Sequence, residues 1–133
     1  MSRYMLDANA ISASVRGLGG VRARMRATAP ADLTASAIAE AEVLYGLARR
    51  PEARRLGEAV RAVLEALTIL PWTSAAAEAY GPLRAGLEQA GRSIGALDML
   101  IAAHAIAEEA VLVTSDKGFG RIPGLMTEDW AAG

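Results

Sequence analysis

Cysteine is absent from this 133-residue sequence, and histidine occurs only once, at His104. The lack of cysteine excludes disulfides, thiolate zinc sites and cysteine nucleophiles. The single histidine excludes metal sites and catalytic pairs that need two imidazoles.

Long apolar runs are also lacking. No stretch reaches the length of a membrane span, and the N-terminus has neither the basic nor the apolar region of a signal peptide. We therefore expect no membrane association and a cytoplasmic location. The formal net charge of −1 argues against a protein that coats nucleic acid generally. Of the 14 basic residues, however, all but Lys117 are arginine, and several are clustered.

Short apolar runs alternate with helical patterns along the chain. Strands are expected at residues 3–6, 32–36, 68–70, 110–113 and 125–127. Helices are expected at residues 10–15, 21–27, 38–50, 52–67, 74–90 and 98–109. Gly46 is expected to allow close packing of its helix. This alternation predicts an α/β fold with a mainly parallel sheet, and the length fits a single domain over residues 1–133.

Four acidic residues fall at one predicted edge of this sheet. Asp7 follows the first strand and Asp116 the fourth, while Asp98 opens the helix expected at 98–109. Glu42 lies one turn into the helix after the second strand. The carboxyl ends of parallel strands share one crevice, so we expect the four carboxylates to lie together. They would repel one another unless a cation lay between them, and oxygen ligands suit Mg²⁺ or Mn²⁺.

Each acid alone also has a structural explanation. Asp7 and Asp98 occupy positions typical of helix caps, and Asp116 that of a turn residue. Glu42 alone would be an ordinary solvated helix residue. Their coincidence at one edge favours a metal site that activates water for an in-line displacement at phosphorus.

Other candidate groups give weaker signals. His104 lies on a different side of its helix from Asp98 and is interpreted as a packing residue. Ser36, Ser93 and Ser115 have no histidine or lysine spaced to activate them, so we discount them as nucleophiles. Two arginine clusters are either solvated helix faces or contacts to a phosphate backbone; they comprise Arg22, Arg24 and Arg26, and Arg49, Arg50, Arg54 and Arg55.

The segments that carry these acids resemble the PIN domain family, and within it the VapC-type toxin ribonucleases of bacterial type II toxin–antitoxin pairs. They are YMLDAN at 4–9, SAIAEAEVLYG at 36–46, GRSIGALDMLIAAHA at 91–105, LVTSDKGFGRIPGL at 112–125 and EDW at 128–130. The resemblance covers nearly the whole chain. It implies a PIN-like three-layer α/β/α sandwich and a Mg²⁺- or Mn²⁺-dependent endoribonuclease that hydrolyses RNA phosphodiester bonds.

The resemblance also implies roles for individual residues. The family's catalytic and metal-binding quartet is matched by Asp7, Glu42, Asp98 and Asp116, and its supporting polar residues are matched by Asn9 and Thr114. The three aspartates would bind the metal, and Glu42 would either bind it directly or orient a water. Ala8, Ala39 and Ser115 stand where the family often has threonine, threonine and asparagine. These departures affect the hydrogen bonds that support the metal ligands, and not the reaction class.

The implied partners are RNA and a small VapB-type antitoxin whose C-terminal tail crosses the active site. Toxin homodimers or toxin–antitoxin hetero-oligomers are expected. The groove for the antitoxin is expected among apolar residues near the N-terminus and on the following helix, namely Ile11, Val15, Leu18, Leu44 and Leu47.

Two other functions fit less well. The first is a catalytically inactive PIN-fold module that binds RNA or protein, which the three departures would favour. The second is a phosphate-accepting receiver domain, which needs a lysine after a later strand than its acceptor aspartate. Lys117, the only lysine, directly follows Asp116. This spacing argues against the receiver.

Overall fold

The computed structural model describes residues 2–132 of the chain. Its strands are β1 (Tyr4–Leu6), β2 (Leu33–Ser36), β3 (Thr68–Leu70), β4 (Val111–Val113) and β5 (Met126–Glu128). Its α-helices are α1 (Ala8–Arg16), α2 (Val21–Arg26), α3 (Ala37–Ala48), α4 (Arg54–Ala66), α5 (Ser74–Gln89) and α6 (Ala96–Ala107). Two 3-10 helices complete the described elements, η1 (Pro30–Asp32) and η2 (Lys117–Arg121). Every expected strand and helix is present, with boundaries within a few residues of those expected.

The strands form one sheet in the order β3-β2-β1-β4-β5, and all four neighbouring pairs are parallel. The chain moves outward from β1 to β2 and β3, then returns to the other side of β1 for β4 and β5. The order therefore reverses between β1 and β4. In open α/β sheets, ligands bind beyond the carboxyl ends of the strands at such a reversal.

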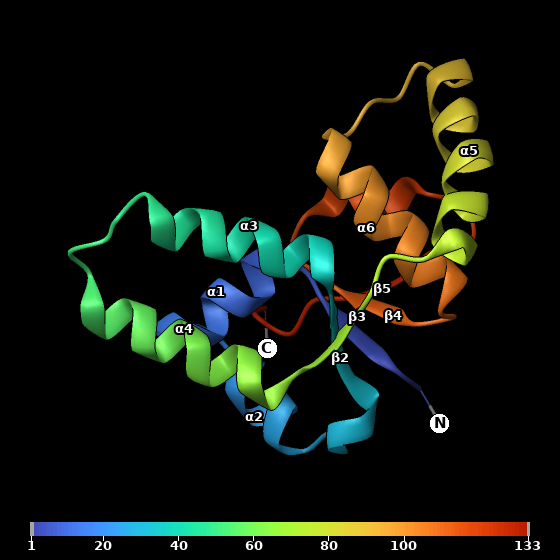
Figure 1. Cartoon of the computed structure of the whole chain (residues 1–133). Coiled ribbons are helices and arrows are strands. Elements are labelled where there is room, and N and C mark those ends of the chain that lie inside the picture. The colour runs from blue at the N-terminus through green and yellow to red at the C-terminus, as the bar shows by residue number, and fades with distance from the viewer. Residues whose placement is uncertain (1, 133) are drawn as a thin grey trace.

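Helices cover both faces of the sheet, as Figure 1 shows. The pair α5 and α6 packs on one side, and α1 and α4 pack together on the other. Helix α3 contacts α1, α4 and α6, so it joins the two groups of helices. This arrangement confirms the predicted three-layer α/β/α sandwich with a parallel sheet.

The central strands are apolar on both faces, as strands between two helical layers must be. Met5, Leu6, Leu112 and Val113 are all essentially inaccessible to solvent, while residues of the edge strands β3 and β5 are partly exposed. The buried centre holds the carboxyl ends of β1 and β4 in a fixed relative position, with Leu6 in register with Val113.

Glycines serve different purposes at two positions. Gly19 has a φ of +58°, and a β-carbon there would overlap the backbone carbonyl of Ala131, so only glycine fits this turn. Gly46 differs from expectation. A β-carbon on Gly46 would meet no atom within 4 Å, so this glycine does not serve close helix packing.

Within the described residues, no helix is both long enough and apolar enough to cross a membrane.

Candidate active site

Asp7 follows β1 directly and is 4% exposed. It is the N-cap of α1, and its Oδ1 accepts a hydrogen bond of 2.8 Å from the backbone nitrogen of Ala10. Burial raises the pKa of this carboxyl, and repulsion by Asp98 and Asp116 raises it further. Interactions with the Thr114 side chain and the Ala10 backbone oppose that rise. Asp7 is therefore both a helix cap and a member of an acidic cluster.

Glu42 lies on α3 and is half-buried. Its Oε1 is buried, and no donor among the described residues bonds to it. Burial raises the pKa of Glu42, and repulsion by Asp98 and Asp7 adds to this effect. A buried carboxylate oxygen without a donor is costly unless a cation or proton compensates it.

Asp98 lies in the first turn of α6 and does not cap the helix. The helix begins at Ala96 after Gly95, so the cap explanation given for Asp98 is wrong. Its carboxyl is half-buried, and its pKa is raised first by burial and then by repulsion from Asp116. The helix dipole favours an acidic side chain in the first turn, but it does not account for the position of Asp98 beside another carboxylate.

Asp116 follows β4 by three residues and has a structural role as well. Its Oδ1 accepts a bond of 2.8 Å from the backbone nitrogen of Gly118 and caps η2, as the turn explanation expected. Its own backbone nitrogen donates to Thr114 Oγ1 over 3.0 Å. Thr114, which is buried beside Asp7, thus links the ends of β1 and β4.

Four elements therefore bring acids to one edge of the sheet: β1, α3, α6 and the segment after β4. Each carboxylate acts electrostatically on at least one of the others. This edge lies at the strand-order reversal between β1 and β4. That the four acids bind a cation together stays a prediction.

A PIN domain sequence model matches residues 4–125 of the chain. Ribonuclease VapC2 of Rickettsia felis is 42% identical over 96 residues, which cover 71% of this chain and 72% of that protein. This chain is a PIN-domain protein of the VapC family.

Two further similarities extend over nearly the full length. The tRNA(fMet)-specific endonuclease VapC of Shigella flexneri is 29% identical over 133 residues, covering 98% of this chain and all of that protein. The crystal structure of VapBC2 from Rickettsia felis, bound to a DNA fragment from their promoter, matches with a TM-score of 0.89 and 34% identity. It covers 96% of this chain and 98% of that one.

The PIN-domain acids fit a divalent cation by their chemistry. All four donors are carboxylate oxygens, the ligands that Mg²⁺ and Mn²⁺ prefer. Burial and mutual repulsion raise the pKa values of Asp7, Glu42 and Asp98, and Glu42 Oε1 has no donor among the described residues, so a cation would stabilise the charged form of these groups. In residues 2–132, however, no three Asp, Glu or His side chains are close enough to hold one ion as they stand. Binding would require a change of side-chain position.

A cleft of about 390 Å³ lies between α1, α3 and α4, and of the four site acids Glu42 lines it. Its polar lining residues include Glu42, the exposed Asn9 and three arginines, Arg16, Arg49 and Arg50. Its apolar lining residues are Ala8, Val15, Val43, Leu47, Leu56 and Val60. Asn9 makes no hydrogen bond to a site acid among the described residues, so its supporting role stays a prediction.

Only part of the expected antitoxin groove lines this cleft. Val15 and Leu47 do so, but Ile11 is completely buried in the core and cannot contact a partner. Leu18 is exposed outside the cleft, and Leu44 lines a separate small pocket. Leu56 and Val60 on α4 also line the cleft. Their helical spacing could be seen in the sequence, but the packing of α4 against α1 could not.

The two arginine clusters separate in the structure. Arg22 donates to the carbonyls of Ser14 and Val15 at the end of α1, over 2.6 and 2.9 Å. Arg24 pairs with Glu128 over 2.8 Å and lies over the Trp130 ring. These two are structural. Arg49 and Arg50, by contrast, border the cleft that contains Glu42.

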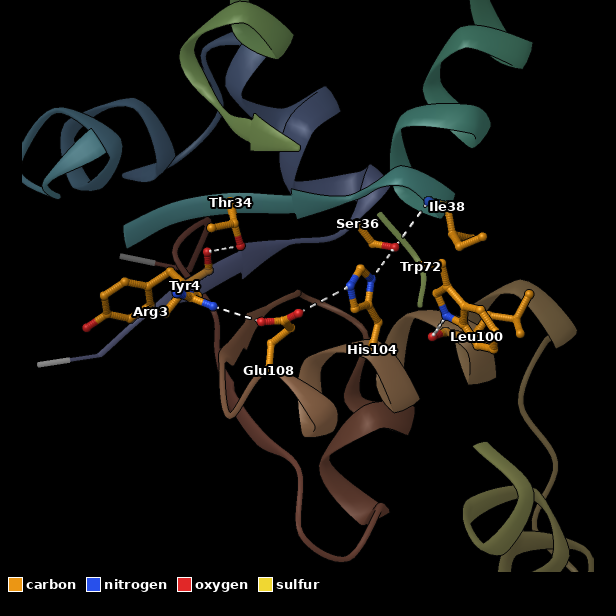
Figure 2. A network of polar contacts seen from close by, with 9 residues as sticks. All are labelled: Arg3, Tyr4, Thr34, Ser36, Ile38, Trp72, Leu100, His104 and Glu108. Atoms are coloured by element: carbon orange, nitrogen blue, oxygen red, sulfur yellow. Dashed lines mark hydrogen bonds and ion pairs between the residues drawn. The ribbon is translucent and has the colours of Figure 1, made fainter. Parts of the chain in front are cut away.

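The structure confirms that His104 is a packing residue, because it is completely buried, but Ser36 differs from expectation. His104 Nδ1 lies 2.8 Å from Ser36 Oγ, so a histidine does contact this serine (Figure 2). The two residues are 68 positions apart, which no spacing pattern reveals. Both are completely buried, and the Ser36 hydroxyl caps α3, so Ser36 is still no nucleophile.

Proposed function

We propose that this VapC-family protein is a metal-dependent endoribonuclease toxin that hydrolyses RNA phosphodiester bonds. The observation that carries the proposal is the convergence of Asp7, Glu42, Asp98 and Asp116 from four elements on one crevice. The names of the Rickettsia and Shigella relatives, a ribonuclease and a tRNA endonuclease, support the same activity. Cellular RNA as substrate is also our reason for proposing a cytoplasmic location.

Each acid would have a distinct task. Asp7, Asp98 and Asp116 would hold Mg²⁺ or Mn²⁺, and Glu42 would bind it directly or orient the attacking water. The bound cation would supply Lewis acidity and a water of lowered pKa. Thr114, which bonds to the backbone of Asp116 and interacts with Asp7, would keep those two carboxylates in place. Arg49 and Arg50 would contact phosphates along the cleft.

We further propose a VapB-type antitoxin as partner, bound along the cleft with its tail over the acids. The support is the likeness to the VapBC2 complex and a cleft that combines apolar walls with arginines and Glu42. A positively charged tail residue would neutralise the carboxylates that repel one another. A homodimer or a toxin–antitoxin hetero-oligomer remains the proposed assembly.

The test is cleavage of total cellular RNA, and of a tRNA pool containing tRNA(fMet), with Mg²⁺ or Mn²⁺ and with chelator. Asp7→Asn should abolish cleavage and leave the fold intact, because asparagine caps helices about as well as aspartate. Asp32→Asn is the matched control, since Asp32 lies at the opposite, amino end of β2.

Cleavage retained by Asp7→Asn would contradict the mechanism. If the folded wild type, freed of antitoxin, cuts no RNA, a metal titration by calorimetry distinguishes two cases. A protein that binds metal without cutting has a substrate missing from the sample. A protein that binds none is the alternative, a catalytically inactive module for RNA or protein binding.

A further inference from the structure

His104 lies at the contact between two helices that carry site acids. It is on α6, is completely inaccessible to solvent, and contacts Ser36 through Nδ1 (Figure 2). Ser36 ends β2 and is the N-cap of α3. This 2.8 Å bond is therefore a direct polar link between α6 and the start of α3.

The Ser36 hydroxyl can take either part in its bond to the histidine. Its Oγ accepts from the backbone nitrogen of Ile38 over 3.1 Å. It can also donate its hydrogen to His104 Nδ1 or accept one from it, and the ring is neutral in both cases. Burial lowers the pKa of His104, which also favours the neutral ring.

The other side of the ring faces the end of α6. His104 Nε2 has no hydrogen-bond partner among the described residues, and the Glu108 Oε1 carboxylate oxygen lies 4.0 Å from it. Glu108 itself pairs with Arg3 over 2.8 Å (Figure 2). The polar contact that the ring makes is thus the one to Ser36, through Nδ1.

The two linked helices carry carboxylates that repel each other. Glu42 follows Ser36 on α3 by less than two turns, and Asp98 precedes His104 on α6 by the same interval. Asp98 acts electrostatically on Glu42. Without a fixed link, this repulsion would favour separation of the two helix ends.

We propose that His104 is a positioning residue for the metal site: its bond to Ser36 fixes the separation of Glu42 from Asp98 and thereby the affinity for a divalent cation. The inference rests on the proposed metal-dependent function. His104 touches no reacting group in this role and acts only through the two helices.

Three variants test it. His104→Leu removes the bond at similar volume. His104→Asn keeps a polar atom near the position of Nδ1 and should restore it. Thr34→Val is the matched control. Buried Thr34 donates an equally short bond, 2.8 Å from Oγ1 to the carbonyl of the partly buried Tyr4, and this bond joins two strands and not the acid-bearing helices (Figure 2).

Mn²⁺ affinity is measured by calorimetry and stability by thermal unfolding. His104→Leu and Thr34→Val should both melt lower than wild type. Only His104→Leu should bind Mn²⁺ at least about tenfold more weakly, the usual effect of losing a residue that orients metal ligands. His104→Asn should bind within about threefold of wild type. Wild-type affinity in His104→Leu would overturn the proposal and leave a stabilising role alone.

A second measurement does not depend on metal. Metal-free crystal structures of wild type and His104→Leu give the distance between the Glu42 and Asp98 carboxylates, which should increase in the variant. An unchanged distance overturns the inference even if the proposed function holds. If wild type binds no Mn²⁺ but the distance between the Glu42 and Asp98 carboxylates increases in the variant, the proposed metal-dependent function is refuted. The structural link between His104 and Ser36 is then still supported. Should His104→Leu not fold, His104→Met removes the same bond, leaves Ser36 as the cap of α3 and is held to the same two criteria.

Discussion

Asp7 combines two demands in one side chain. As the cap of α1 it must accept a bond from the Ala10 nitrogen, and as a site acid it must lie buried beside other carboxylates. Burial and repulsion raise the pKa values of Asp7, Glu42 and Asp98 above their ordinary values of 3.8, 4.5 and 3.8. In metal-free protein these charges oppose folding, as charges gathered for binding generally do.

The raised pKa values predict an unusual pH dependence. Between the ordinary and the raised pKa values the folded protein binds more protons than the unfolded chain, so stability falls as pH rises. We therefore expect the metal-free free energy of unfolding to decrease as pH rises above about 4, in line with the unfolded-state values. Asp7→Asn should reduce this decrease and melt about 3 °C higher than wild type at pH 7, the change expected from about 1 kcal/mol.

Denaturant unfolding at several pH values, with chelator and with Mg²⁺, checks this prediction. Added Mg²⁺ should stabilise wild type at pH 7 and leave Asp7→Asn nearly unaffected. A metal-free stability that increases steadily from pH 4 to pH 7 would contradict it.

The arginines show that one residue type has different roles on different elements. Arg22 satisfies the last carbonyls of α1, whereas Arg50 follows α3 and borders the cleft. We expect Arg22→Ala to lower stability by about 1 kcal/mol, the value of a few lost hydrogen bonds, with RNA affinity unchanged. Arg50→Ala should weaken RNA binding several-fold and reduce the slope of log affinity against log salt by about one.

Fluorescence binding titrations of Asp7→Asn protein with labelled RNA at several salt concentrations measure both effects without cleavage. Thermal unfolding of the same samples separates stability from binding. Equal loss of RNA affinity in the two arginine variants would refute the division between structural and cleft arginines.

The elements themselves could be predicted because their signals are local. Thr68 to Leu70 is an apolar run closed by a proline, and the strand has those bounds. The contacts between elements could not. His104 and Ser36 meet only because α6 packs beside β2, and Arg22 meets the end of α1 only after the turn at Gly17–Gly20. Ile11 and Val15 share one helix periodicity, yet one is core and the other lines the cleft.

At the scale of the whole molecule, the order of the strands explains why acids far apart in the sequence could be predicted to lie at one edge of the sheet. Asp7 and Asp116 each follow a strand, and parallel pairing of β1 with β4 places both at one edge. What the sequence did not reveal is that the carboxylates stand too far apart to hold one ion together. Their separation depends on helix packing, which is also where His104 acts.

The same architecture makes one cleft serve two proposed ligands. Its apolar walls, including Val15, Leu47 and Val60, lie beside Glu42, so a bound peptide would cover this acid, which RNA must reach. Leu47→Glu should therefore weaken inhibition by the antitoxin at least tenfold, because a charge would be buried against an apolar segment. Leu44→Glu, on the same helix but lining a separate pocket, is the matched control.

Inhibition constants from RNA cleavage, together with Mn²⁺ affinity, distinguish the possibilities. Leu47→Glu should keep wild-type Mn²⁺ affinity, because Leu47 lies on α3 more than one turn beyond Glu42 and is no metal ligand. Loss of antitoxin inhibition with metal binding intact would place the partner in the cleft. Equal antitoxin affinity in Leu47→Glu and wild type would show that the antitoxin binds elsewhere. Inhibition by direct occlusion of the cleft would then be refuted.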